Sequence, residues 1–309
     1  MNLRSSGTRK TLKPASQAPA SAHADAGFLC RKLQICGIYY TLIGIMGALN
    51  LMQSTSLQSY AGYAWEFLRL NPKYRMSFER SRSAQGPPKK LINGGYLFQS
   101  KSTSKAAEKW GLQYFADPAL DYLHAPVFWT EKAFPKSLAI GVEPINSANI
   151  SNKSIQFSDI SCTRHHLLTA NGLRQTVLKS SHYWLQFFGY PKMPSDEKGR
   201  IIIHVDGGIG LRKRLDVLGF LADLRDSKPV YSEYENTKQS YENLQFYWET
   251  RALRTKGISY RGMAESLFGK DRVMQEWDNN GCSLKSKIVR ACARGHELSQ
   301  HGYLDLLKK

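Results

Sequence analysis

Apolar residues recur at helical spacing in the first folded stretch of the chain. In residues 60–70, Trp65 and several tyrosines fall on one side of a helix, and Pro72 ends it. A second short helix is expected at 72–82, before a glycine and two prolines break the pattern. We therefore predict a helical, partly irregular N-terminal domain at 55–145.

Aromatic residues and prolines are dense in the second half of that domain, between residues 110 and 129. A stretch of this kind favours buried aromatic side chains joined by turns. A peptide-binding groove is the other interpretation of the same composition.

Between residues 150 and 230 the apolar period changes to two. Asn171-Gly172 separates two alternating runs within 165–179, which is a strong signal for a β-hairpin. Two further strands are expected, and the leucines that follow them return to helical spacing. The pattern predicts a small antiparallel sheet with a covering helix, built from residues 165–179, 182–188, 200–205 and 211–226.

The last part of the chain, 237–309, reads as a helical domain. Gly257 ends the first of its helices, and Gly269 ends the second. Ser259 can cap the second helix, and Ser283 can cap the fourth. The expected helices cover residues 241–256, 260–268, 271–277 and 284–298. Together with the predicted sheet, these helices give an α+β fold class.

The fourth of these helices has two distinct faces. Leu284, Ile288, Ala291 and Leu298 form its inward line, while Lys287, Arg290 and Arg294 follow one another at i, i+3 and i+7 on the other side. A helix with a dry face and a row of cations suits insertion into the major groove of DNA. An ordinary amphipathic surface helix would show the same spacing.

The spacing of the helices departs from a simple helix-turn-helix. Residues 269–282 separate the second and fourth helices, where a simple turn uses about three or four residues. The short helix at 271–277 fills the gap. Which helix enters the groove stays open, and charge favours the fourth.

The overall charge narrows the class of partner. Lys and Arg number 43 against 25 Asp and Glu, for a net charge of +18, and 42% of residues are hydrophobic. A chain this basic that can also form a core usually binds a polyanion, and nucleic acid is a better candidate than an anionic membrane. The five cysteines show no C-x-x-C spacing, which favours a reducing, cytoplasmic compartment.

The first fifty residues allow several interpretations. Residues 1–27 read as a disordered tail, and 33–52 are mostly apolar without a charge. This second run is long enough to cross a bilayer, but that topology would export the predicted DNA-binding domain. The favoured expectation for residues 1–51 is an untranslated leader, with the true start near Met52. A buried or partner-facing helix and a true membrane anchor are the alternatives.

No catalytic or metal-binding constellation is apparent. Cys162, His165 and His166 mix metal-ligand types, but no second pair with zinc spacing accompanies them. The glycine-rich turn at 206–210 lacks both common phosphate-loop patterns, and no G-x-S-x-G nucleophile elbow occurs. We therefore expect no enzyme activity, no metal and no cofactor.

Longer runs of sequence resemble a known family. Residues 247–254, 259–277 and 284–307 are very similar to the DNA-binding domain of the RovC-like family of transcription regulators tied to type VI secretion. Residues 63–75 and the aromatic stretch resemble the transcriptional-regulator-like domain found in front of it. Residues 1–51 have no counterpart in this pattern.

The resemblance implies a promoter-binding regulator, expected to be an activator. Its expected partners are double-stranded promoter DNA, further copies of the same chain in a homo-oligomer, and RNA polymerase, but not a membrane. A basic module that binds RNA or protein without promoter specificity is the alternative. The residues expected to contact DNA are Arg261, Ser283, Lys285, Lys287, Arg290 and Arg294.

Overall fold

The computed structural model describes ten parts of the chain, and all of them belong to the unit that begins at Thr55. The described residues are 59–82, 86–91, 94–100, 105–144, 160–189, 199–205, 208, 210–226, 234–278 and 283–309. The predicted tail and the apolar run at 33–52 lie outside them, as does most of the glycine-rich turn at 206–210. Among the described residues, no helix combines the length and apolar character that a membrane span requires.

Two capped helices begin this part of the chain, where the apolar spacing predicts them. In α2 (Tyr60–Leu68) the side chain of Ser59 accepts a hydrogen bond from the amide of Gly62. In α3 (Pro72–Ser81) the Asn71 side chain accepts from the amides of the first turn, and proline occupies the first helical position. The same Asn71 amide group donates to the carbonyl of Ser299 at 2.9 Å, which fixes the N-terminal helices to the C-terminal end of the chain.

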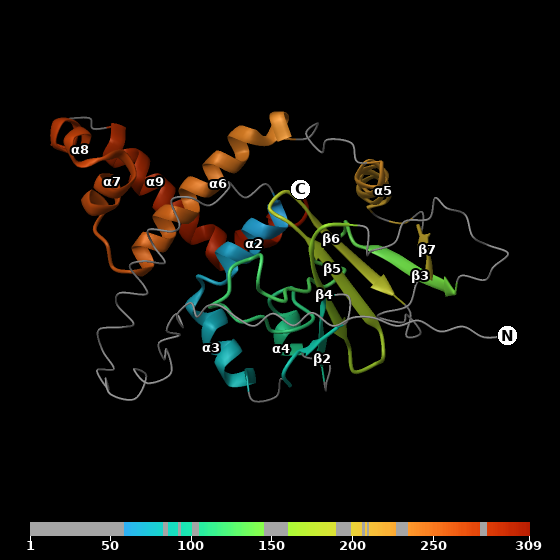
Figure 1. Ribbon diagram of the computed structural model, residues 1–309. Helices are drawn as coiled ribbons and strands as arrows, with labels where there is room; N and C mark the ends of the chain where they lie inside the picture. Colours follow the sequence, from blue (N-terminus) through green and yellow to red (C-terminus); the bar gives the residue numbers. More distant parts are fainter. Residues whose placement is uncertain are drawn as a thin grey trace, which may run out of the picture. The chain divides into compact units, whose positions relative to one another are not determined.

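A mixed sheet occupies the middle of the chain (Figure 1). Its strands lie in the order β1-β2-β4-β5-β6-β3-β7 among the described residues. Their bounds are Lys89–Lys90 (β1), Tyr96–Gln99 (β2), Leu138–Pro144 (β3), Thr163–Leu168 (β4), Arg174–Lys179 (β5), Trp184–Gly189 (β6) and Gly199–His204 (β7).

The predicted antiparallel sheet is right at its centre and wrong at its edges. Strands β4, β5 and β6 form the expected antiparallel meander, with Gly172 at a φ of 80° in the tight turn. However, β2 pairs parallel with β4, and β3 pairs parallel with β6. Strand β7 then pairs antiparallel with β3 rather than with β6. The sheet is larger and mixed because β2 and β3, which lie on either side of the aromatic segment, join it from far away in sequence.

The aromatic segment forms core, which supports the first of its two interpretations. Trp65, Phe128 and Trp129 are fully buried, and so is Ala107 of the short helix α4 (Lys105–Glu108). The same core includes residues from the π-helical turn η5 (Leu298–Gly302) and from α10 (Tyr303–Leu306). Here the hydroxyl of Tyr303 donates to the carbonyl of Trp110 at 3.2 Å. The chain end therefore stabilises the N-terminal helices directly.

The helix predicted to cover the sheet is α5 (Leu211–Arg225). Its Leu221 is buried against Leu138 and Ile140 of β3 and against Leu185 and Phe187 of β6. Gly210, with a φ of 90°, makes the sharp turn into this helix.

Candidate nucleic-acid interface

Four helices in the C-terminal part of the chain share a separate apolar core. They are α6 (Tyr234–Thr255), α7 (Tyr260–Phe268), α8 (Lys270–Glu276) and α9 (Ser283–Glu297). The predicted helices exist, but α6 begins earlier than residue 241, where the expected apolar spacing starts. The buried members of this core are Met263, Ala264, Val273, Leu284, Ile288 and Cys292.

Local signals define α7 closely. The Ser259 side chain accepts from the amide of Gly262 at 3.1 Å, so the predicted cap is confirmed. Gly269, with a φ of 88°, separates α7 from α8 and lets the chain turn sharply there. Helix α8 lies in the stretch between α7 and α9, where the sequence predicts a short helix.

Helices α6 and α9 cross and contact each other (Figure 1). At Gly295 an added Cβ would lie 2.5 Å from the carbonyl oxygen of Tyr247 and 2.9 Å from the Cβ of Arg251. Only glycine permits such an approach of two backbones. Burial lowers the pKa of the Arg251 guanidinium beside this crossing. The ordinary pKa of arginine is so high that the group stays charged.

The crossing orients the surface of α9. Its buried residues, Leu284, Ile288, Ala291, Cys292 and Gly295, follow one line along the helix. At about 100° per residue, Ser286, Arg290 and Ala293 lie roughly opposite that line. Lys287 lies at its edge. Of the three cations in the predicted row, only Arg290 therefore lies roughly opposite the buried face, while Lys287 and Arg294 lie toward its side.

The surroundings of the predicted cations differ accordingly. The Lys287 ammonium lies over the rings of Phe246 and Phe268, at 5.2 and 5.3 Å from their centres. Arg290 is exposed, and its Nε donates to the carbonyl of Ser286 at 3.3 Å. Within the described residues it pairs with no carboxylate.

Two other predicted contacts carry exposed ion pairs. Arg294 meets Glu297 at 2.6 Å, with the two side chains 49% and 62% exposed. Arg261 on α7 lies 3.3 Å from Glu265 and 3.8 Å from Asp278. Exposed pairs of this kind contribute little free energy, about 0–1 kcal/mol, so a phosphate can compete for these guanidinium groups.

Ser283 and Lys285 are exposed on the first turn of α9. They line a shallow hollow together with Ser286, Val289 and Arg290. Val289 is 40% exposed there although it is apolar. The sequence interpretation followed cations alone and missed Ser286 and Val289. The helical period that identifies the buried line also places these two residues outside it, on the exposed side of α9.

The charge of α9 is strongly one-sided. Its sequence contains four lysines and arginines against one acid, Glu297 at the C-terminal end. The N-terminus of α9 adds partial positive charge at the end of the helix where the hollow lies. Chemically, this surface can bind phosphate oxygens and donate to base edges.

The cysteine and histidines considered as metal ligands do not lie in a cluster of metal-ligand side chains within the described residues. His165 and His166 are buried next to each other on β4, and burial lowers their pKa values to about 2 and about 4. His166 Nδ1 lies 2.9 Å from the Thr176 hydroxyl. In the part of the chain that the structure describes, no three His, Cys, Asp or Glu side chains gather as metal ligands would.

Comparison with known proteins gives two matches to family models. Residues 204–308 match the RovC DNA-binding domain, described as the DNA-binding domain of a transcription factor of the type VI secretion system (T6SS). Residues 55–115 match a proteobacterial transcriptional regulator-like domain. No curated protein matches the chain.

These matches first define the class of protein, which is a transcription factor with a C-terminal DNA-binding domain. Within that class, residues 204–308 match the RovC DNA-binding domain of T6SS transcription factors, and the match to a proteobacterial regulator-like domain precedes them. The resemblance seen in the sequence is thereby confirmed. The matched C-terminal region includes α9 and the hollow on its surface.

Proposed function

We propose that this chain is a sequence-specific activator of type VI secretion genes that binds promoter DNA through the exposed face of α9. The observation that carries the proposal is the position of Arg290. This side chain is exposed and unpaired with acid within the described residues, and it lies opposite the line that locks α9 onto α6.

The chemistry of this face suits a major groove. Arg290 can donate two hydrogen bonds to a guanine edge, and the Val289 methyl groups can contact a thymine methyl group. The Ser286 hydroxyl can donate or accept. These three residues are our candidates for reading sequence.

The remaining predicted residues suit the phosphate backbone. Ser283 and Lys285 stand at the N-terminal end of α9, where the helix itself attracts anions. Arg261 and Arg294 can exchange their exposed carboxylate partners for phosphates. Lys287 remains a predicted DNA contact, but its ammonium is shared with two aromatic rings.

A single short helix reads few base pairs, so we expect the protein to act as a homo-oligomer that presents several copies of α9. As an activator it would also contact RNA polymerase. Both partners belong to the proposal, together with the cytoplasmic location that access to bacterial DNA requires.

A competition gel shift tests the function. The full chain is expected to retain a type VI secretion promoter fragment in the presence of excess random DNA of the same length. Retention on that fragment alone supports the proposal, and DNA footprinting then locates the bound sequence.

The alternative function predicts a different result in the same experiment. A basic module that binds nucleic acid through charge alone would lose the promoter fragment equally to random DNA or to RNA. Equal competition would therefore overturn promoter specificity.

A further inference from the structure

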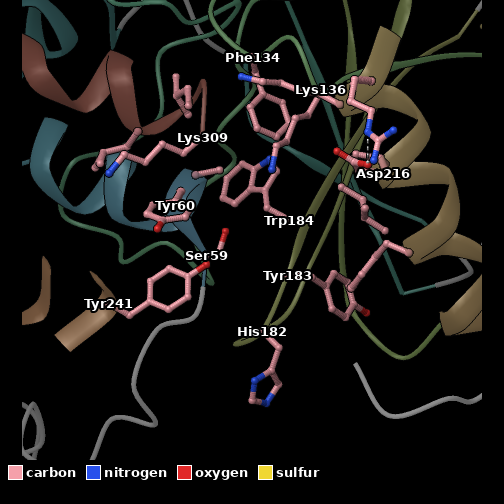
Figure 2. Close-up of a pocket in the computed structure, with 18 residues that line it drawn as sticks. Ser59, Tyr60, Phe134, Lys136, His182, Tyr183, Trp184, Asp216, Tyr241 and Lys309 are labelled. Atoms are coloured by element: carbon pink, nitrogen blue, oxygen red, sulfur yellow. Dashed lines mark ion pairs between the residues drawn. The ribbon is translucent and has the colours of Figure 1, made fainter. Parts of the chain in front are cut away.

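A cavity of about 590 Å³ lies where several segments distant in sequence meet, and no residue of α7, α8 or α9 lines it. Its walls come from the start of α2, the start of β6, α5, Tyr241 of α6 and the C-terminal end of the chain. Figure 2 shows Tyr60, Tyr241 and Lys309 on one side, Tyr183 and Asp216 on the other, and Trp184 between them.

Aromatic rings form much of the cavity wall. The rings of Tyr60 and Tyr241 lie 4.9 Å apart, and those of Tyr183 and Phe220 lie 5.6 Å apart. Trp184 contributes a further ring, and its buried indole N–H has no acceptor among the described atoms. A flat, apolar ring system could pack between these walls.

The charged side chains of the cavity are mostly positive. Arg212 and Lys213 come from the first turn of α5, and Lys309 comes from the chain end, where its ammonium lies over the Tyr60 ring. Lys136 and His182 also line the cavity. Its one acidic side chain within the described residues is that of Asp216, which pairs with Arg212 at 3.6 Å.

The N-terminus of α5 adds to this positive charge. Gly210 precedes the helix and provides no side-chain cap, and the first turn contains no acidic residue. The helix dipole therefore adds partial positive charge at the end of α5 that carries Arg212 and Lys213.

The size of the cavity suits a small molecule, because ligand sites typically enclose about 300–1,000 Å³. The contact between the Lys213 ammonium and the carbonyl of Lys308 ties α5 to the chain end beside the cavity. We propose that this cavity binds a small aromatic acid, with its ring between the tyrosines and Trp184 and its negative group beside Arg212 and Lys309. This site is distinct from the proposed DNA-binding face.

Such a site would be placed to influence α6. Tyr241 lies in the cavity wall, and the same helix continues to the crossing with α9 at Gly295. Any effect of the ligand on DNA affinity rests on the proposed function, whereas ligand binding itself does not.

The binding experiment uses the full chain without DNA and 8-anilinonaphthalene-1-sulfonate, an aromatic sulfonate whose fluorescence rises in apolar surroundings. We expect saturable binding of one probe per chain. The matched uncharged probe, N-phenyl-1-naphthylamine, should bind about tenfold more weakly, because it lacks the group that makes charge-assisted hydrogen bonds.

Variants locate the site. The double variant Arg212→Gln/Lys309→Gln should weaken binding of the sulfonate by about tenfold or more and leave the uncharged probe unaffected. Arg214→Gln removes a cation from the same helix outside the cavity wall and should change neither probe.

Three results would overturn the proposal: no saturable binding, equal binding of the two probes, or full sulfonate binding by the double variant. Because no DNA is present, each of these results leaves promoter binding by α9 untouched. Conversely, failure of the gel shift would leave the cavity proposal standing.

Discussion

Two cations of α9 stand three residues apart and have different surroundings. Lys287 lies over the rings of Phe246 and Phe268 and so joins α9 to both α6 and α7. Arg290 is exposed, and the hydrogen bond that its side chain makes among the described residues is to the Ser286 carbonyl of its own helix. Sequence spacing placed both in one row, because it reports the angle around the helix and not which neighbouring rings lie beside it.

The difference predicts separable effects of two substitutions. Arg290→Ala should weaken promoter binding by about 1–3 kcal/mol if the side chain touches a base edge, with no loss of stability. Lys287→Ala should lower the free energy of unfolding by roughly 0.5–2 kcal/mol through the lost ring contacts, in addition to any lost DNA contact. Fluorescence titration with promoter DNA and urea unfolding measure the two quantities. Wild-type promoter affinity in the Arg290 variant would contradict the assignment of the reading face.

A buried lysine predicts a pH effect on stability. Lys179 is fully buried in β5, and its ammonium donates to the carbonyls of Tyr122 and Ala125. Burial lowers its pKa from 10.5 to about 7, although the charges of Asp121 and Glu66 oppose the shift. Between these two pH values the unfolded chain keeps the proton and the folded chain does not. Raising the pH from about 7 toward 10 therefore favours the folded state, by up to about 1.4 kcal/mol per pH unit.

The measurement is urea unfolding of the wild type and of Lys179→Met at several pH values. The absolute stability of the variant also reflects the two carbonyls that lose their donor, so only the pH slope is compared. We expect the difference in unfolding free energy between the two proteins to change with pH above 7. Parallel pH profiles would show that Lys179 keeps its proton when folded.

Among the helices and strands, the sequence predicts best those features that depend on neighbouring residues. Ser259 and Gly269 bracket α7, and Asn171-Gly172 marks the β4–β5 hairpin, because caps and tight turns depend on a few consecutive residues. Strand β3 escaped prediction although Leu138 and Ile140 alternate with smaller or polar positions. Its partners in β6 and β7 lie far along the chain, so no turn signal accompanies it.

In the candidate site, too, the features set by neighbouring residues are predicted and those set by distant residues are not. The amphipathic period predicts α9 and its buried line, but the sequence does not indicate that Gly295 brings α6 close or that Lys287 meets two rings. Both depend on residues some 20 to 50 positions away. The exposed Val289 was missed for a simpler reason, since apolar residues are ordinarily assigned to the core.

Two helical glycines provide a matched test of the α6–α9 crossing. Replacing either by alanine gains about 1 kcal/mol of helix propensity. At Gly219 in α5 nothing lies within 4 Å of the new Cβ, so Gly219→Ala should stabilise the protein by roughly that amount. At Gly295 the Cβ would meet the Tyr247 carbonyl, so Gly295→Ala should destabilise it by about 1–3 kcal/mol and weaken DNA binding by shifting α9. Thermal unfolding compares them, and an increase in Tm for both variants would mean that the helices are not in close contact.

For the whole molecule, the net charge of +18 makes some attraction to DNA unavoidable and so cannot identify the interface. Salt dependence separates a local interface from this general attraction. Each phosphate contact adds about −0.9 to the slope of log K against log salt. If the four cations of α9 each neutralise one phosphate, the slope per bound chain should be about −3.6.

Substitutions then assign that slope to particular side chains. Lys285→Ala should reduce its magnitude by about 0.9 on promoter and random DNA alike, because a phosphate contact does not depend on sequence. Lys213→Ala removes a cation that lies far along the chain from α9, beside the cavity, and should leave the slope unchanged. Equal reductions from both substitutions would mean that the chain binds DNA through its overall charge. A reduction confined to Lys285 would localise the contact to α9, because only a side chain that displaces a counterion from a phosphate contributes to the slope.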